Sequence, residues 1–253
     1  MTGSLRPVRQ KRSSTPTSCR TATGLSPEGR PVPNERCILL LGGSFDPVHE
    51  GHIGLARYFC TLLHPDELRL IPAGRPWQKP EMSTAPEHRI AMLRLAFADW
   101  VVPVQIDTQE IERDGPSYAV DTLRTLRKAV GNQTSLVWVI GADQLLNLHT
   151  WHQWQALFSL TNFCIAVRPG YELSREGLND QVAAEISRRQ ANAEQLRASA
   201  SGLCFIATNL ALDISSSALR ATLGDNPSLP EPQGLLPAPV LDYIQRHHLY
   251  QTI

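Results

Sequence analysis

Short apolar runs alternate along the chain with segments in which apolar residues recur at helical spacing. Six runs have the length and the apolar content of buried strands: residues 37–41, 68–72, 101–106, 135–141, 163–167 and 203–207. Seven segments are predicted helices: residues 53–63, 86–98, 118–130, 151–158, 175–197, 216–223 and 240–247. Because this alternation is typical of βαβ units, we predict an α/β fold with a parallel sheet flanked by helices.

The first 36 residues differ from the rest of the chain. They hold seven Lys or Arg against two Glu, fifteen Ser, Thr or Pro, and no aromatic residue. Such a segment cannot bury enough apolar surface to offset the entropy of ordering, so we expect residues 1–36 to be a disordered basic tail. An organellar transit peptide has a similar composition, but this segment lacks an amphipathic apolar face. Residues 37–253 are predicted to form a single domain, with a polar excursion at about 171–200, a linker at 224–234 and a C-terminal helix within 238–249.

The composition excludes several classes of function. The 253 residues are 42% hydrophobic, which is enough for a sizeable core, and 24 Lys or Arg balance 24 Asp or Glu. A net charge of zero argues against coating a nucleic acid or an anionic membrane, and the apolar runs are too short to span a bilayer. Five cysteines, odd in number and without a CxxC pair, indicate reduced thiols and a cytoplasmic protein.

The sequence GGSFDPVHEGH at residues 42–52 follows the first predicted strand and opens a helix. Gly42 and Gly43 allow backbone amides to approach a phosphate closely, and the helix start adds free N–H groups. The pattern is neither GxxxxGK[ST] nor GxGxxG, which argues against ordinary NTPases and dehydrogenases. His49 and His52 are three residues apart, so both imidazoles face one side. The alternatives are two surface histidines, or a metal pair that the neighbouring acids do not complete.

This segment resembles the (H/T)xGH signature of the nucleotidyltransferase superfamily, which has a Rossmann-like, doubly wound parallel sheet. Residues 214–220, ISSSALR, are similar to the second signature of that superfamily, ISSTxxR. The hydroxyl of Ser215 or Ser216 can cap a helix, and Arg220 lies about one turn further along with a permanent charge. The resemblance implies that Arg220 reaches the triphosphate of the nucleotide. The alternative is an ordinary capping stretch with a solvent-exposed arginine.

The middle of the chain narrows the resemblance. GPSYAVDTL at 115–123, IGADQL at 140–145, Trp151, RPG at 168–170 and the final Leu-Tyr pair resemble the bacterial nicotinate-nucleotide adenylyltransferases over about residues 37–251. The resemblance implies adenylyl transfer from ATP to nicotinate mononucleotide, giving nicotinate adenine dinucleotide and pyrophosphate in NAD biosynthesis.

The resemblance also assigns roles to individual residues. It implies that three residues act on the phosphates in catalysis: His49, His52 and Arg220. The ATP-binding set comprises Gly42, Gly43, Ser44, Phe45, His49, His52, Gly141, Asp143, Ile214, Ser215, Ser216 and Arg220. The set for the mononucleotide comprises Lys79, Tyr118, Ala119, Trp151 and Arg168.

Within these sets, Asp143 suits a ribose hydroxyl, and Trp151 would stack on the pyridine ring. Tyr118 and the neighbouring amides would receive the nicotinate carboxylate. The family pattern PPHK has Gln78 in place of its histidine here, which leaves a charge at position 78 in doubt. Trp151 as a core residue, with Trp154 in the stacking role, and Lys79 as a solvated loop residue remain open.

No protein metal site is expected, because no carboxylate cluster is evident. Mg²⁺ would be held mainly by substrate phosphates and water. ATP and nicotinate mononucleotide are the expected partners, without nucleic acid or membrane, and a homo-oligomer remains open. Three rival functions are a pantetheine-phosphate adenylyltransferase or cytidylyltransferase, an enzyme acting on nicotinamide mononucleotide, and a non-catalytic nucleotide-binding module.

Overall fold

The structure is a computed structural model that describes residues 36–75, 84–167, 177–208, 210, 219–220, 223 and 234–250. Residues 34–253 form one compact unit. The predicted tail, apart from Arg36, and the predicted linker, apart from Gly234, lie outside the described residues.

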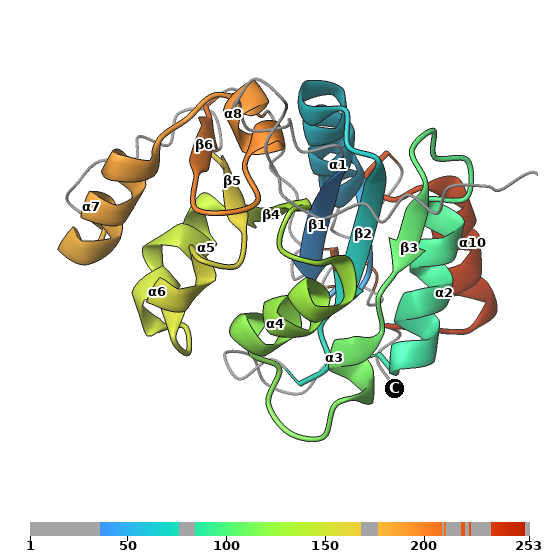
Figure 1. Cartoon of the computed structure of the whole chain (residues 1–253). Coiled ribbons are helices and arrows are strands. Elements are labelled where there is room, and N and C mark those ends of the chain that lie inside the picture. Colours follow the sequence, from blue (N-terminus) through green and yellow to red (C-terminus); the bar gives the residue numbers. More distant parts are fainter. Residues whose placement is uncertain are drawn as a thin grey trace, which may run out of the picture. The chain divides into compact units, whose positions relative to one another are not determined.

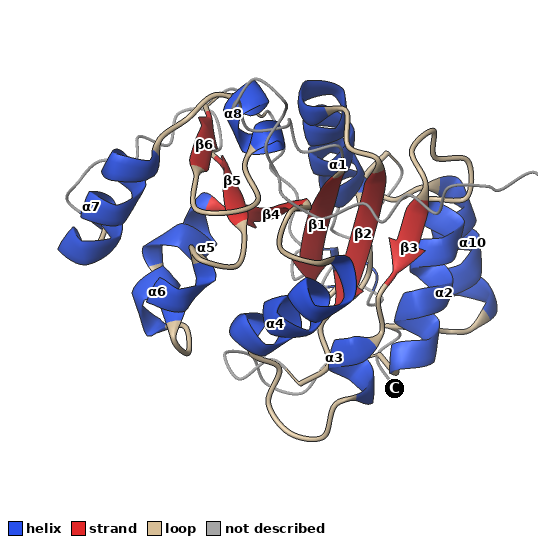
Figure 2. Ribbon diagram, in the orientation of Figure 1, coloured by secondary structure: helices blue, strands red, loops and turns tan. Residues whose placement is uncertain are grey.

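Six parallel strands form one sheet in the order β3-β2-β1-β4-β5-β6 (Figures 1 and 2). The strands are β1 (Cys37–Gly43), β2 (Glu67–Pro72), β3 (Val104–Ile106), β4 (Ser135–Gly141), β5 (Asn162–Ala166) and β6 (Cys204–Ala207). The predicted α/β fold with a doubly wound parallel sheet is confirmed. All six predicted strands exist, and the sheet buries almost every residue of β1, β2, β4 and β5, but not those of β3.

The strand predicted at residues 101–106 is half as long as expected. Val101 is 98% exposed and lies before β3 rather than within it. β3 is one of the two edge strands and pairs with β2 alone. With no second neighbour to extend the pairing, the strand ends before it includes the exposed Val101.

The long helices agree with the predicted segments to within a few residues at their ends. They are α1 (Glu50–Leu63), α2 (Pro86–Ala96), α4 (Ala119–Val130) and α10 (Ala238–Arg246). Of the helix predicted at 216–223, the described residues Leu219, Arg220 and Leu223 are helical.

Two helix predictions are wrong in detail. The single polar helix expected at 175–197 is two helices, α7 (Asp180–Arg189) and α8 (Ala193–Ala198). α7 ends where Gln190 becomes extended, and Asn192 starts α8 by accepting a hydrogen bond from the Gln195 amide at 2.9 Å. The segment expected to be helical at 151–158 forms only α6 (Trp154–Leu157).

Three short elements were not predicted at all. They are α3 (Gln109–Glu112), α5 (Ala142–Leu146) and the 3₁₀ turn η1 (Leu148–Thr150). Elements of three to five residues are too short to show a hydrophobic period, so tertiary contacts rather than pattern determine them.

Helices cover both faces of the sheet (Figure 2). On one face, α1, α2, α8 and α10 pack against alternate residues of the strands, such as Leu39 and Leu41. On the other face, α4, α5, α6 and α7 pack against the intervening residues, such as Ile38 and Leu40. Each strand of the centre is thus buried on both sides, which is the usual environment of a parallel sheet.

The chain reverses its direction of winding between β1 and β4. These two strands are neighbours, and Leu41 lies opposite Val139, so their carboxyl ends meet at the same edge of the sheet. Gly42 has no side chain there because an added Cβ would lie 2.9 Å from the Trp138 ring. In open α/β sheets a ligand site forms at this kind of reversal.

Two further properties bear on the class of protein. None of the described helices is both long and apolar enough to cross a membrane. Cys37, Cys60, Cys164 and Cys204 are free thiols, and burial raises the pKa of the Cys37 thiol to about 11. These thiols therefore stay protonated and unreactive at neutral pH.

Candidate active site

The loop that joins β1 to α1 has its backbone held by hydrogen bonds to its carbonyl oxygens. The Ala73 amide donates to the Gly43 carbonyl at 2.8 Å. The Arg89 guanidinium donates to the Ser44 carbonyl at 2.8 Å. The amides of Ser44 and Phe45, by contrast, donate no hydrogen bond to any of the described residues. The loop thus offers N–H groups while its carbonyl groups are already bound, as an anion site requires.

His49 and His52 stand together at the start of α1. His49 is the residue before the first turn, and the two ring centroids lie 3.8 Å apart. The His49 amide donates to Nδ1 of His52 at 3.3 Å. Since that nitrogen accepts, the proton of a neutral His52 ring is on Nε2, which is then a donor. The structure brings the two imidazoles together, as their spacing predicts.

The two histidines differ in their surroundings. His49 is 4% exposed, and its Nδ1 is buried without a hydrogen-bond partner among the described residues. Burial lowers the pKa of His49 to about 4, because desolvation disfavours the charged ring. His49 is therefore a neutral imidazole at neutral pH.

Arg220 reaches the same loop from the distant C-terminal part of the chain. Its Nη1 donates to the Asp46 carbonyl at 2.7 Å. Its partners in the second motif, Ile214, Ser215 and Ser216, lie outside the described residues.

Arg89 is a residue of this region to which sequence reasoning assigned no chemistry. It is 1% exposed, and its guanidinium bridges the carbonyls of Ser44 and Ala73, both at 2.8 Å. Burial lowers the pKa of Arg89, and the nearby charge of Asp46 opposes that shift. The sequence could have indicated that Arg89 is buried, because it precedes Met92 by three residues and Leu93 by four, which places all three on one face of α2.

The carboxyl end of β4 presents the residues predicted to meet adenosine. Gly141 ends the strand, and its amide donates to the Gln144 side chain at 3.0 Å. Asp143 follows in α5, is exposed, and has a carboxylate oxygen where a Cβ of residue 141 would lie. A larger residue at 141 would displace this carboxylate.

Tyr118 and Trp151 both lie on the face of the sheet opposite to α1. Tyr118 precedes α4 and Trp151 follows η1, and both pack against the core on that face. The Tyr118 ring lies 4.5 Å from the ring of His152, which is next to Trp151. The Trp151 indole N–H is buried without an acceptor among the described residues. Trp154, in contrast, is a core residue that packs on Phe158.

The loop after β2 is fastened to the start of α4. The amide of Ser117 donates to the Arg75 carbonyl at 3.0 Å, and the Arg75 amide donates to the Ser117 hydroxyl at 3.1 Å. Gly74 approaches α3 so closely that a Cβ would collide with the Glu110 carbonyl. The Glu110 carboxylate accepts from the Thr122 hydroxyl at 2.8 Å, and burial raises the pKa of Glu110.

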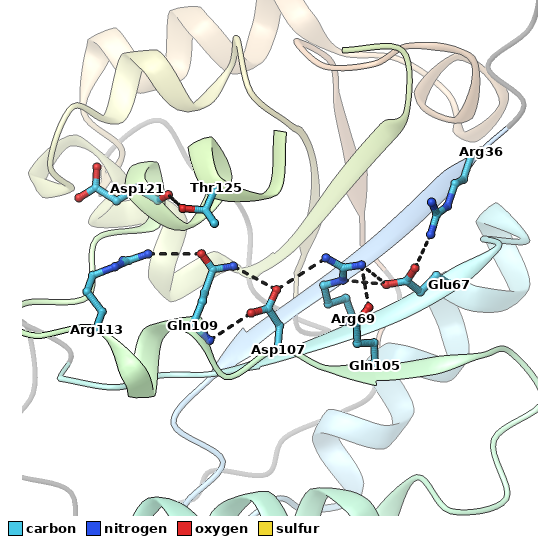
Figure 3. Close-up of polar contacts among 9 residues, drawn as sticks. All are labelled: Arg36, Glu67, Arg69, Gln105, Asp107, Gln109, Arg113, Asp121 and Thr125. Atoms are coloured by element: carbon cyan, nitrogen blue, oxygen red, sulfur yellow. Dashed lines mark hydrogen bonds and ion pairs between the residues drawn. The ribbon is translucent and has the colours of Figure 1, made fainter. Parts of the chain in front are cut away.

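A chain of polar contacts holds α3 in this position (Figure 3). Arg69 on β2 contacts both Glu67, by a hydrogen bond of 2.7 Å, and Asp107, at 3.7 Å. Gln109 on α3 donates to Asp107 at 3.0 Å and accepts from Arg113 at 3.3 Å. Ion pairs and side-chain amides thus hold this short helix in position. Because apolar packing does not determine it, no apolar pattern in the sequence predicted it.

Most of the predicted site residues cluster at this edge of the sheet. The loop residues, both histidines and Arg220 lie together at the end of β1, with Gly141 and Asp143 at the neighbouring strand. Ala119 is the first residue of α4. Lys79 and Arg168 lie outside the described residues. The sequence analysis assigned no role to Arg89, Glu110, Ser117 and Thr122, although Ser117 and Thr122 lie within the motif at 115–123.

Comparison with known proteins gives consistent matches. Residues 40–222 match the family model described as cytidylyltransferase-like. A probable nicotinate-nucleotide adenylyltransferase from Herminiimonas arsenicoxydans is 49% identical over 219 residues, covering 86% of this chain and 98% of its own. One from Laribacter hongkongensis is 40% identical over 218 residues, covering 85% of this chain and 94% of its own.

A solved structure supports the fold. The nicotinic acid mononucleotide adenylyltransferase of Plasmodium falciparum, complexed with NaAD, superposes with a TM-score of 0.65. The alignment covers 85% of this chain and 98% of that one at 17% identity, so it bears on the fold alone. With the two bacterial relatives and the family model, the conclusion is that the chain belongs to the nicotinate-nucleotide adenylyltransferase family of cytidylyltransferase-like proteins.

Proposed function

We propose that the protein transfers the adenylyl group of ATP to nicotinate mononucleotide, giving nicotinate adenine dinucleotide and pyrophosphate. The observation that carries the proposal is the loop after β1. Arg89 and Arg220 bind the carbonyls of Ser44 and Asp46 in this loop, and the imidazoles of His49 and His52 lie together where it enters α1. The phosphate site alone does not specify the acceptor, so the choice of nicotinate mononucleotide is based on membership of the family.

In this reaction a phosphate oxygen of the mononucleotide attacks the α-phosphorus of ATP. A new P–O bond forms to the acceptor, and the bond to the leaving pyrophosphate breaks with its electron pair. No nucleophilic side chain is needed, so the protein acts by alignment and by stabilising charge on the phosphate oxygens. Donors that are already in position gain most from this, because they do not reorganise during the reaction.

The three proposed phosphate donors, His49, His52 and Arg220, differ in their charge. His49 is neutral, so it contributes a hydrogen bond and no formal charge. His52 accepts from the His49 amide at Nδ1, so its neutral ring carries the proton on Nε2, and we propose that this N–H donates to a phosphate oxygen. Arg220 supplies the permanent positive charge, as a guanidinium does at any physiological pH.

We propose that a divalent cation enters this site as a companion of the substrate. Within the described residues there is no group of three or more His, Cys, Asp or Glu that could hold a metal. Mg²⁺ bound to the substrate phosphates and to water would neutralise the charge of the pyrophosphate.

On the acceptor side, we propose that Trp151 stacks on the pyridine ring and that Tyr118 and the amide of Ala119 border the carboxylate. Both aromatic rings are half-buried, and Trp154 is committed to the core. Lys79 and Arg168 are proposed to bind the mononucleotide phosphate or ribose. Gly141 and Asp143 at the end of β4 are proposed to meet the adenosine.

The proposal is tested by pyrophosphate release from the full-length protein with ATP and Mg²⁺. Nicotinate mononucleotide, nicotinamide mononucleotide and 4′-phosphopantetheine are offered in separate reactions. We expect a strong preference for the nicotinate form. A preference for another acceptor would retain the phosphate chemistry and overturn the acceptor pocket. Absence of release with all three would favour a nucleotide-binding protein without transferase activity.

His52→Ala removes one donor that acts on the phosphates. We expect kcat to fall by ~10²-fold or more, while the affinity for ATP changes little, by analogy with loss of one preorganised donor. The measurement is steady-state kinetics with calorimetric ATP binding. His64→Asn at the other end of α1 is the control, since asparagine tolerates the left-handed conformation of that residue, whose φ is 45°. An unchanged kcat in His52→Ala would remove His52 from the reaction.

Trp151→Ala removes the proposed stacking surface. We expect KM for the mononucleotide to rise by ~5- to 150-fold, which corresponds to the ~1–3 kcal/mol of stacking a base on an aromatic side chain. KM for ATP should stay nearly constant. Trp100→Ala removes another half-buried tryptophan, beyond the carboxyl end of α2, and should leave both KM values unchanged. If Trp151→Ala raises only the KM for ATP, the ring assignment is wrong.

A further inference from the structure

The loop after β1 is tied to the last turn of the chain through a buried carboxylate. Asp46 is 2% exposed. Its Oδ1 accepts a hydrogen bond of 2.7 Å from the hydroxyl of Tyr250, a residue 204 positions away in sequence. Its carbonyl accepts from Arg220 at 2.7 Å. One residue of the loop thus joins the C-terminal segment to the arginine of the second motif.

Charge explains why the Asp46 carboxylate is tolerated at this depth. The charge of Asp46 acts on Arg89, which lies beneath the same loop, and Arg220 acts on Tyr250. Arg89 therefore acts on the buried carboxylate of Asp46, and Arg220 binds the backbone carbonyl of the same residue. A buried charge is strongly destabilising unless it is paired and hydrogen-bonded, so each donor to Asp46 contributes to holding this residue in place.

Tyr250 is suited to act as a permanent donor. Burial, together with the neighbouring Asp46 carboxylate, raises the pKa of Tyr250 far above its ordinary value. The hydroxyl consequently keeps its proton throughout the physiological range. The Thr84 side chain also hydrogen-bonds this hydroxyl, which helps to fix its direction.

The backbone that delivers Tyr250 is unusual. After α10 ends, His248 has a φ of 50° and Tyr250 a φ of 65°, both in the left-handed region that bulky residues rarely adopt. Such conformations are strained and persist when surrounding contacts enforce them. The chain is bent twice within three residues, and the bend ends with the tyrosine hydroxyl on Asp46.

We propose that Tyr250 is a positioning residue for phosphate transfer: its hydroxyl fixes Asp46, and Asp46 fixes both the loop and Arg220. This inference rests on the proposed function, because it assigns Tyr250 to the phosphate side of that reaction. Tyr250 need not touch the substrate. Its effect reaches the phosphates through the Asp46 backbone and the guanidinium that Asp46 binds.

Tyr250→Phe removes the hydroxyl and keeps the ring. A hydrogen bond to a charged group is worth enough that we expect kcat/KM for ATP to fall at least ~10-fold. KM for the mononucleotide should remain within about twofold of wild type, because its proposed pocket lies at α4 and η1. A loss of folded protein would lower kcat and leave both KM values unchanged, so a raised KM for ATP beside an unchanged KM for the mononucleotide separates positioning from unfolding.

Tyr243→Phe is the matched control. The Tyr243 hydroxyl also belongs to the C-terminal segment and also makes a hydrogen bond, to Nδ1 of His88 at 2.9 Å. This contact joins α10 to α2 and involves no residue of the loop after β1. We expect kcat/KM for ATP in Tyr243→Phe to stay within about twofold of wild type. Thermal melting of both variants verifies that each is folded at the assay temperature.

A double-mutant cycle with Asp46→Ala identifies the route of the effect. If Tyr250 acts through Asp46, adding Tyr250→Phe to Asp46→Ala should change kcat/KM by less than about twofold. Independent, multiplicative losses in the double variant would assign the effect to Thr84 or to packing and overturn the proposal. Wild-type kcat/KM for ATP in Tyr250→Phe would overturn it as well.

The same variants separate this inference from the proposed function. If wild-type protein transfers adenylate to no tested acceptor, the proposed function fails. ATP binding measured by calorimetry then decides the inference: binding weakened at least ~5-fold in Tyr250→Phe but not in Tyr243→Phe would support it. Equal binding in the two variants would contradict it.

Discussion

Three carbonyl oxygens of the loop after β1 are already hydrogen-bonded: that of Gly43 by the Ala73 amide, that of Ser44 by Arg89 and that of Asp46 by Arg220. The carbonyl and the N–H of a peptide point in opposite directions, so fixing the carbonyls of a loop determines where its amides can point. The phosphate site depends on this constraint. Without it, the two glycines would leave the loop free to turn its carbonyls toward the anion, where they would repel the phosphate oxygens.

The donors that impose the constraint carry charge, and the protein balances that charge locally. Arg89 and Asp46 are 1% and 2% exposed, and each lowers the desolvation cost of the other. The positive groups thereby stand at a fixed distance from the place where the phosphates are proposed to bind. His49, which lacks such a partner and is kept neutral by burial, adds a donor without a second buried charge to balance. The site is therefore positive through its arginines and the helix start, with no excess charge on the whole chain.

Local pattern was sufficient for the central sheet and for the placement of the two histidines together. The strands of the sheet centre are apolar on both faces, so each could be recognised as a run, and the pair His49 and His52 could be placed on one face from their spacing alone. The extent of β3 and the position of α3 could not be predicted from local pattern. β3 has a neighbouring strand on one side only, and α3 is placed by the polar contacts of Arg69 and Gln109.

The features of the site that could not be predicted from the sequence depend on contacts between residues far apart in the chain. The bond between Asp46 and Tyr250 joins residues 204 positions apart, and no local pattern connects them. The burial of Arg89 could have been predicted, since it shares the buried face of α2 with Met92 and Leu93. Trp151 and Trp154 are both compatible with stacking until the structure shows that Trp154 packs in the core.

The most direct test of this account is a pair of crystal structures of the protein, without nucleotide and with a non-hydrolysable ATP analogue. If the loop is preformed, its backbone at residues 43–49 should shift by less than about 1 Å on binding, as in other preorganised complexes. The phosphate oxygens should then contact the loop amides, His52 and Arg220, while Arg89 and Tyr250 keep their bonds to Ser44 and Asp46. A loop that rebuilds on binding, or a nucleotide that binds away from the end of β1, would contradict the account.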